Sequence, residues 1–217
     1  MHHICKIIVR HIKNIIFDLG GVIINLAPEL TTLEFDKLSE IPFQKAFNSP
    51  LKTQLFDRFE KGQMGEVDFF EKLKKELRFH GSYQDMLKAW NAMLLGVPDS
   101  RLDLLVQAKL NYRTFLLSNT NEAHVAAFEN DLYHTNGVKH LSDYFEETYY
   151  SCRIGMIKPD REIFEFVLHR NKLKASETVF IDDSPQHVKG AGECSINAYL
   201  MQPNMDIEEL LEQLRLL

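Results

Sequence analysis

The sequence predicts an α/β fold with a doubly wound parallel sheet and an all-α insertion. Short, continuous apolar runs alternate with segments of helical periodicity, which is typical of parallel strands that helices cover on both faces. The clearest of these runs stop at a carboxylate or at a small polar residue. Roughly seventy residues after the first run contain no convincing strand, which indicates a separate group of helices.

Five apolar runs are predicted as strands. They cover residues 14–17, 114–117, 148–151, 178–181 and 196–200. Runs of about four apolar residues suit strands buried on both faces, whereas a half-exposed strand alternates with polar residues. Because helical segments separate these strands, the sheet is predicted to be parallel.

Three helices of the sheet region are predicted from signals at their first turns. Asp99-Ser100 is expected to cap one helix. Pro159 is expected in the first turn of a second, where its missing N–H costs nothing. Asp206 and Glu209 are expected to form a capping box at the start of a third.

The insertion is predicted to be a bundle of helices. Within residues 66–77, an apolar stripe is formed by Val67, Phe70, Leu73 and Leu77. The expected parts of the chain are a core domain of residues 13–27 and 99–217, a helical domain of residues 28–98 and an N-terminal arm of residues 1–12.

The composition is that of a globular protein. Of the 217 residues, 45% are hydrophobic and 26% are charged, which excludes a disordered or collagen-like chain. The net charge of −6 argues against a nucleic-acid partner, and no run approaches the roughly 18 apolar residues of a membrane span. Cys5, Cys152 and Cys194 form no CxxC pair and indicate reduced thiols, hence a cytoplasmic protein. We expect a monomer or homodimer without nucleic-acid or membrane partners.

Polar residues stand where three of the predicted strands end. They are Asp18, Ser118, Asn119, Asp182 and Asp183. Singly, each is explained by a helix cap or a turn, but ligands of an open parallel sheet bind beyond these strand ends. Carboxylates crowded there repel one another unless a cation lies among them, and Mg²⁺ prefers such oxygen ligands. The pattern therefore predicts a magnesium site.

Two further features point to an anion at the same edge. Gly20-Gly21 follows Asp18 closely, and paired glycines after a strand let backbone N–H groups approach an anion. Lys158 precedes a predicted helix start. Most lysines are simply solvated, but near a metal-bound phosphate Lys158 would bind the anion and keep Asp18 ionised.

The order of these motifs resembles that of the haloacid dehalogenase-like hydrolase superfamily, from about Asn14 onward. The motifs are Phe17-Asp18-Leu19-Gly20-Gly21-Val22, Leu117-Ser118-Asn119-Thr120, Gly155-x-x-Lys158-Pro159 and Phe180-Ile181-Asp182-Asp183. Each is weak alone, but four in this order are specific. The resemblance implies a Rossmann-like core with a helical cap domain in the insertion. The flanking residues are similar to a bacterial branch that includes glucose-1-phosphate phosphatase and, less closely, to the phosphatase domain of soluble epoxide hydrolases.

The resemblance implies a magnesium-dependent phosphatase of a small phosphorylated metabolite, with a sugar phosphate as the expected substrate. Asp18 would attack phosphorus and form an aspartyl-phosphate. The implied Mg²⁺ ligands are Asp18, the backbone carbonyl of Gly20, Asp183, and Asp182 directly or through water. The implied phosphoryl-binding residues are Ser118, Asn119, Gly21 and Lys158, of which Ser118 and Lys158 would also stabilise the transition state.

One residue departs from the pattern of the family. Its phosphatases usually carry a second aspartate two residues after the nucleophile as general acid and base, and here that residue is Gly20. Such a group is worth roughly 10²–10⁴ in rate. Three alternatives follow: a substrate with a good leaving group, a proton supplied by a cap residue or by His187, or slow turnover in a protein that chiefly binds phosphate.

Other classes fit the sequence less well. A 2-haloacid dehalogenase needs no metal and so no acidic pair at Asp182-Asp183, and a response-regulator receiver carries its pair near the N-terminus. A non-catalytic phosphometabolite binder stays open because of Gly20. Cap residues considered for specificity are Glu60, Lys61 and Gln63, whereas His134 and His140 are assigned no role.

Overall fold

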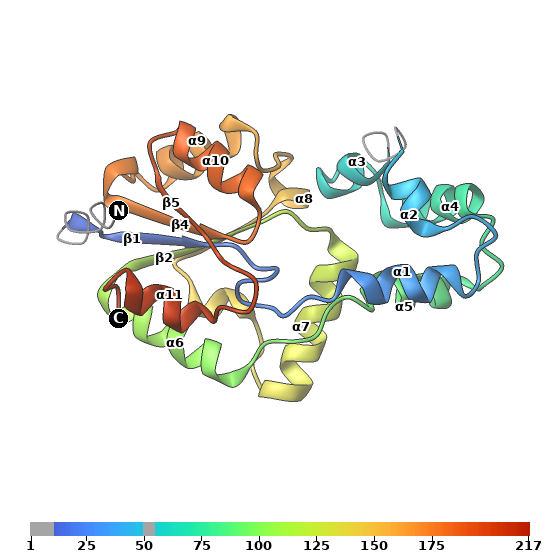
Figure 1. The fold of residues 1–217 in the computed structure, drawn as a ribbon, viewed down its shortest axis with the longest axis horizontal. Coiled ribbons are helices and arrows are strands. Elements are labelled where there is room, and N and C mark those ends of the chain that lie inside the picture. The colour runs from blue at the N-terminus through green and yellow to red at the C-terminus, as the bar shows by residue number, and fades with distance from the viewer. Residues whose placement is uncertain (1–10, 50–54) are drawn as a thin grey trace.

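A five-stranded parallel sheet forms the centre of the molecule. In this computed structural model, which describes residues 11–49 and 55–217, the strand order is β3-β2-β1-β4-β5 (Figure 1). The strands are β1 (Asn14–Phe17), β2 (Arg113–Ser118), β3 (Glu147–Tyr150), β4 (Thr178–Asp182) and β5 (Asn197–Leu200). All four pairings are parallel, which confirms the predicted sheet. The strand order reverses at β1, so a switch point for ligand binding lies there.

Helices cover both faces of this sheet, as Figure 1 shows. One face carries α6 (Asp99–Asn111), α7 (Glu122–Asn136) and α11 (Ile207–Gln213), and the other carries α9 (Arg161–Arg170) and α10 (Pro185–Glu193). Short elements are η3 (Leu141–Tyr144), α8 (Ser151–Ile154) and η4 (Ala175–Glu177). In β1, Ile15 and Phe17 pack in the apolar cluster of the first face and Ile16 in that of the second. Burial on both faces explains why the strands are continuous apolar runs.

The inserted helices form a third apolar cluster and lie beside the carboxyl ends of the strands (Figure 1). They are α1 (Pro28–Asp36), α2 (Phe43–Phe47), α3 (Asp57–Glu60), α4 (Glu66–Leu77) and α5 (Tyr83–Asn91). The described residues of this insertion contain no strand, only isolated bridges. The separate cluster supports the proposed division into a core of residues 13–27 and 99–217 and a cap of residues 28–98. The proposed arm, like Cys5, lies almost wholly outside the described residues.

The predicted stripe of α4 is partly wrong. Val67 is 59% exposed, whereas Phe69 is fully buried. Phe69 stacks on Phe59 at 4.0 Å between ring centroids and also contacts the ring of Trp90. These aromatic partners come from α3 and α5, so the helical period alone could not identify the buried face.

Two of the three predicted helix starts are corrected by the structure. Asp99 lies inside α6, which begins after Pro98, and its carboxylate accepts a hydrogen bond from Asn136. Pro159 lies before α9, whose N-cap is Asp160. Pro159 lies in a turn and not in a first helical turn, since α9 begins only at Arg161.

The third helix start is confirmed in part. Asp206 is the N-cap of α11, and its carboxylate accepts a hydrogen bond from the Glu208 N–H at 3.2 Å. The bond goes to the second helical residue, which is an ordinary N-cap and not the expected capping box with Glu209. Among residues 11–49 and 55–217, no helix has the length and hydropathy needed to cross a membrane.

Candidate active site

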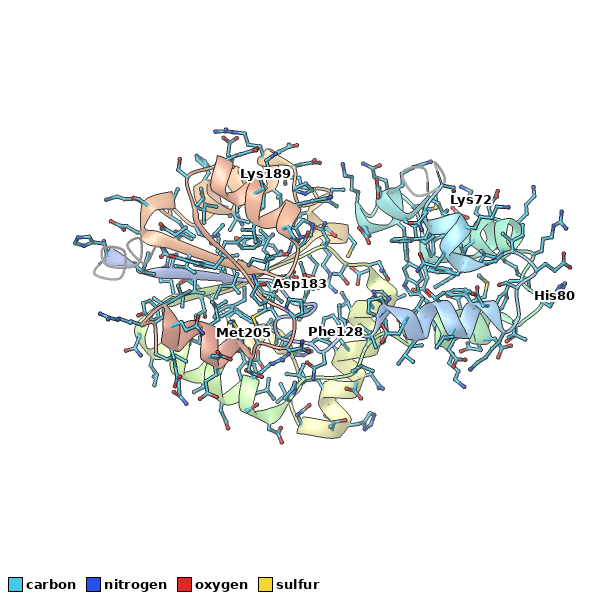
Figure 2. All side chains as sticks on the ribbon, in the orientation of Figure 1. Lys72, His80, Phe128, Asp183, Lys189 and Met205 are labelled. Carbon is cyan, nitrogen blue, oxygen red and sulfur yellow. The ribbon has the colours of Figure 1, made fainter. Side chains whose placement is uncertain are left out.

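The carboxyl ends of neighbouring strands bring the predicted acidic residues together. β1 lies between β2 and β4 in parallel register. Asp18 directly follows β1, while Asp182 ends β4 and is followed by Asp183. One carboxylate oxygen from each of these three residues lies within 4.8 Å of the others. Asp183 stands at the edge of the sheet that faces the inserted helices (Figure 2).

Lys158 connects two of these carboxylates. Its ammonium group donates to Asp18 Oδ1 and to Asp182 Oδ2, each at 2.6 Å, and to the backbone carbonyl of Leu117 at 2.7 Å. The Lys158 side chain is fully buried, as lysines are only when paired. All three donor positions of the ammonium group are therefore directed at the ends of β1, β2 and β4.

Asn119 determines where Lys158 lies. The Asn119 Nδ2 donates to the Lys158 carbonyl at 2.8 Å, and its Oδ1 accepts from the Lys158 N–H at 2.9 Å. These two hydrogen bonds between the Asn119 side chain and the Lys158 main chain join the end of β2 to the turn before α9. Sequence reasoning assigned Asn119 to the substrate, and no local signal indicated that its side chain holds Lys158.

Asp182 is oriented by residues that follow it. Its Oδ1 accepts from the Ser184 N–H at 2.8 Å and from His187 Nδ1 at 3.0 Å. Asp182 is completely buried, whereas Asp183 is exposed at the sheet edge. His187, considered from sequence as a replacement acid, thus contacts the carboxylate of Asp182.

Lys158 balances the charge of the carboxylates only in part. Burial raises the pKa of Asp18 to about 7, because loss of solvent outweighs the attraction of Lys158. Burial and the neighbouring Asp182 also raise the pKa of Asp183. Desolvation opposes ionisation of Asp182 too, but Lys158 and His187 hold the pKa of that carboxyl below its usual value. A divalent cation among these oxygens would remove the repulsion, so both the donor set and the charge fit Mg²⁺.

Gly21 allows Asp183 to approach this cluster. Its φ is +71°, and a Cβ atom there would lie 2.3 Å from Asp183 Oδ2. The Gly21 N–H donates to the Ile24 carbonyl at 2.8 Å within the turn that follows β1. Its predicted contact with substrate stays a prediction, while the structure shows that the missing side chain makes room for Asp183.

Gly21→Ala is expected to weaken Mg²⁺ binding at least about tenfold, because the methyl group displaces the Asp183 carboxylate. Isothermal titration calorimetry with Mg²⁺ measures the change. Gly137→Ala is the matched control, since Gly137 has the same φ of +71° but no atom within 4 Å of the added Cβ. Equal Mg²⁺ affinity in the two variants would show that Asp183 is not a ligand.

A cavity of about 210 Å³ opens next to the turn that follows Asp18 and to the end of β2, although none of the three carboxylates lines it. Gly20, Ser118 and Asn119 line it on the side of the sheet, and Phe43 and Trp90 line it on the side of the inserted helices. Ser118 is buried at the end of β2 and lines the cavity, while its predicted contact with the phosphoryl group stays a prediction. The cavity is therefore the space in which a ligand of the site would lie.

The three cap residues considered for specificity from the sequence occupy three different environments. Glu60 lines the cavity. Lys61 forms an ion pair with Asp160 at 3.4 Å, which joins the cap to the core, and Gln63 is exposed. Of the three, Glu60 alone stands where it can contact a ligand.

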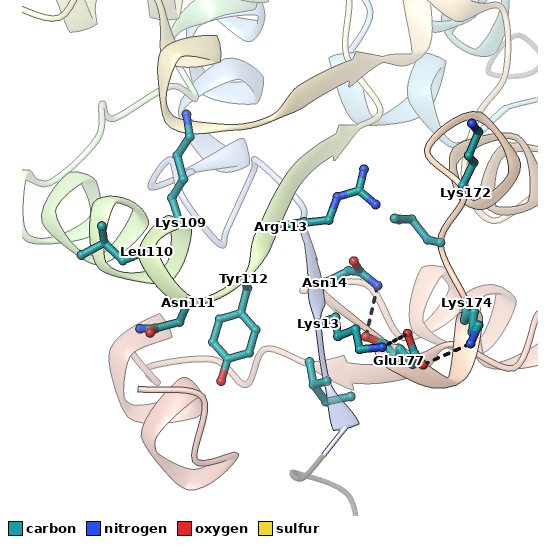
Figure 3. Close-up of a pocket in the computed structure, with 12 residues that line it drawn as sticks. Lys13, Asn14, Lys109, Leu110, Asn111, Tyr112, Arg113, Lys172, Lys174 and Glu177 are labelled. Carbon is teal, nitrogen blue, oxygen red and sulfur yellow. Dashed lines mark hydrogen bonds and ion pairs between the residues drawn. The ribbon is translucent and has the colours of Figure 1, made fainter.

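A larger cavity of about 510 Å³ lies at the opposite, amino ends of the strands (Figure 3). Lys13, Arg113 and Glu177 are among the residues that line it. Lys13 pairs with Glu177 at 3.0 Å, and Arg113 donates to Glu146 at 2.8 Å. No residue predicted for the site lines this cavity, whereas Gly20, Ser118 and Asn119 line the smaller one, which is therefore the candidate active-site cavity.

The chain is similar to known hydrolases over most of its length. A family model described as haloacid dehalogenase-like hydrolase matches residues 12–194. A D-ribitol-5-phosphate phosphatase of Bacteroides thetaiotaomicron is 27% identical over 195 residues, which are 90% of this chain and 94% of that protein. A sesquiterpene phosphatase of Aspergillus oryzae is 26% identical over 181 residues, 82% of this chain and 84% of that protein.

A solved structure agrees with the family match. A HAD family enzyme from Bacteroides thetaiotaomicron, in complex with magnesium and inorganic phosphate, is 32% identical with a TM-score of 0.74, covering 92% of this chain and 98% of that one. Another structure of that enzyme superposes with a TM-score of 0.85 at 33% identity, covering 93% and 99% of the two chains. The four sequence motifs, the strand order and the position of the inserted helices agree with these matches. The chain therefore belongs to the haloacid dehalogenase-like hydrolases.

Proposed function

We propose that this hydrolase is a magnesium-dependent phosphatase of a small phosphorylated metabolite and that Asp18 is its nucleophile. The observation that carries the proposal is the position of Asp18, which is held by Lys158 in a cluster of three carboxylates at the switch point of the sheet. The named phosphatases among its relatives support the reaction class.

Asp18, Asp183 and the Gly20 carbonyl would hold the Mg²⁺ ion, and Asp182 would contribute as a direct ligand or through water. The magnesium complex of the related structure supports this cofactor. When bound, Mg²⁺ neutralises charge on the phosphoryl oxygens and on the attacking carboxylate. The exposed Asp183 is the ligand most open to exchange with solvent, whereas Asp182 is held by Ser184 and His187.

The side chains at the strand ends account for the chemistry of the first step. Lys158 fixes one oxygen of Asp18, and the other oxygen attacks phosphorus as the bond to the leaving alcohol breaks. Ser118 would bind a phosphoryl oxygen, and Lys158, whose three donors are taken up by Asp18, Asp182 and the Leu117 carbonyl, would stabilise the transition state through its charge. Water then hydrolyses the aspartyl-phosphate, which releases phosphate and restores Asp18.

The proton for the leaving group has to come from a residue other than that at position 20, which is glycine. A Cβ atom at Gly20 would lie 2.6 Å from Leu26 Cδ1, so Leu26 occupies that space. His124 is not the acid, since burial lowers its pKa to about 4 and both ring nitrogens have partners. Among the described residues that line the cavity, Glu60 carries the carboxyl group that can deliver a proton.

Two classes of substrate are candidates. A sugar or polyol phosphate, expected from the sequence, is supported by the related D-ribitol-5-phosphate phosphatase. A phosphate ester with an apolar organic part is supported by the related sesquiterpene phosphatase. Both relatives are about equally distant in sequence, so the lining of the cavity has to decide between the classes.

The proposed activity is tested by phosphate release from a panel of phosphate esters of both classes, with Mg²⁺ or with a chelator. We expect release that requires Mg²⁺. Fluoroberyllate with Mg²⁺, which binds only the folded site, is expected to raise the melting temperature by roughly 5–10 °C when saturating. Release that survives the chelator, or no release from any ester, would refute the proposal, and a thermal shift without release would indicate a protein that only binds phosphate.

A further inference from the structure

The cavity beside Gly20 and Ser118 has a lining that differs from that expected for a sugar. Resting on the proposed function, we infer that the substrate is a phosphate monoester of a small apolar alcohol of about the size of a benzene ring or a short isoprenoid chain. The organic part would fill the cavity of about 210 Å³, and the phosphoryl group would lie at its Gly20 end.

The lining is mainly hydrocarbon. Side chains from α2, from the end of α5 and from the connections between cap and core form most of it, including Leu26, Phe43, Phe47, Trp90, Met93 and Leu94. Glu60 is the charged member, and no lysine or arginine of the described residues lines the cavity. Such a surface favours an apolar ligand through burial and offers little that is specific to a polyol.

Several polar side chains on the cap side of the lining are already bonded to the protein. Thr31 donates from Oγ1 to the Trp90 carbonyl at 3.1 Å, and Gln44 Nε2 donates to Thr32 Oγ1 at 3.1 Å. His124 also contacts the Trp90 carbonyl, through Nε2 at 3.2 Å. A sugar or polyol placed here would bury several hydroxyl groups against groups that have partners, and each unmatched hydroxyl lowers affinity.

His124 and Asn121 hold this arrangement in place. Because a carbonyl only accepts, His124 Nε2 carries the proton and its Nδ1 accepts from Asn121 Nδ2 at 3.2 Å. Asn121 Oδ1 accepts in turn from Trp90 Nε1, also at 3.2 Å. The imidazole also stacks on the indole at 5.0 Å, and since both ring nitrogens have partners, His124 offers no unpaired nitrogen to a ligand.

The size of the cavity limits the organic part. An apolar protein cavity of about 150 Å³ accepts benzene, so 210 Å³ suits a group of roughly six to ten carbon atoms. A long lipid chain would exceed it. Six to ten carbons include the aryl, branched alkyl and short isoprenoid alcohols.

The test compares primary alkyl phosphates of increasing length, namely ethyl, butyl, hexyl and tetradecyl phosphate, with D-ribitol-5-phosphate. All have a primary alkoxide as leaving group, so differences in kcat/KM report the organic part. We expect kcat/KM to rise about fourfold per methylene up to hexyl phosphate and to fall for tetradecyl phosphate. Hexyl phosphate should exceed D-ribitol-5-phosphate at least about tenfold.

A pair of variants checks that the cavity is responsible. Phe47→Gln changes a half-buried ring of the lining. Phe166→Gln changes a half-buried ring outside the cavity, which packs on Tyr149 on the sheet face that α9 and α10 cover. We expect Phe47→Gln to lower kcat/KM for hexyl phosphate about tenfold and for ethyl phosphate by less than about threefold, whereas Phe166→Gln lowers both equally or not at all.

The outcomes separate this inference from the proposed function. If kcat/KM did not depend on the length of the alkyl chain and D-ribitol-5-phosphate were the better substrate, the inference of an apolar substrate would be wrong, while the proposed phosphatase activity would be retained. Absence of Mg²⁺-dependent release from every ester would refute the phosphatase and this inference together. The chain-length series uses the unmodified protein, so it decides even if Phe47→Gln fails to fold.

Discussion

Asp18→Asn is expected to lower Mg²⁺-dependent phosphate release by at least about 10⁴-fold, because it removes the nucleophile and one metal ligand together. The fold should persist. Asparagine has the same shape, its oxygen can still accept from Lys158, and a neutral amide does not incur the cost of burying a charge that raises the pKa of Asp18. Phosphate release on the best ester of the panel, together with the melting temperature, measures both effects.

The matched control for this substitution is Asp68→Asn. Asp68 lies exposed in the first turn of α4, far from the carboxyl cluster, and its loss should leave phosphate release unchanged. If Asp18→Asn kept more than about a tenth of the activity while the control behaved like the wild type, Asp18 would not be the nucleophile.

Lys158→Met is expected to have the second largest effect, and on stability as well as activity. Methionine has a similar length but leaves Asp18 and Asp182 buried without their cation. Removing one partner from a buried ion pair costs about 3–5 kcal/mol in the free energy of unfolding. Mg²⁺ should restore part of this loss, since a cation that binds the native state stabilises it.

Urea unfolding in chelator and in Mg²⁺ measures the stability of this variant, and phosphate release should fall at least about 10³-fold. Lys189→Met is the control, because Lys189 is largely exposed on α10 and contacts Glu193 only at 3.8 Å. Unchanged stability of Lys158→Met in chelator would mean that the carboxylates of Asp18 and Asp182 are uncharged without metal and do not depend on Lys158.

The strands were predictable because burial on both faces leaves a local trace. Continuous apolar runs such as residues 14–17 need no information from elsewhere in the chain, and the observed β1 has the same bounds. Helix α4 also begins and ends as expected. Its buried face was not predictable, because the partners of Phe69 are rings on two other helices.

The acidic part of the site was predictable for a similar reason. Parallel strands place their carboxyl ends at one edge, so Asp18, Asp182 and Asp183 had to lie near one another once the strands were assigned. The clamp of Asn119 on Lys158 was not predictable, because these residues are 39 positions apart and their contact depends on the turn before α9.

The sequence by itself determined the fold class, the order of the motifs and the edge of the sheet where the carboxylates meet, because apolar runs and strand ends are local features. The tertiary structure decided which polar groups are free to meet a ligand. Thr31, Gln44 and His124 are polar in the sequence, but their partners come from other segments of the chain and use their hydrogen-bonding atoms. The lining of the cavity is assembled from separate helices and loops between Leu19 and Phe128, so no local pattern records that it is apolar.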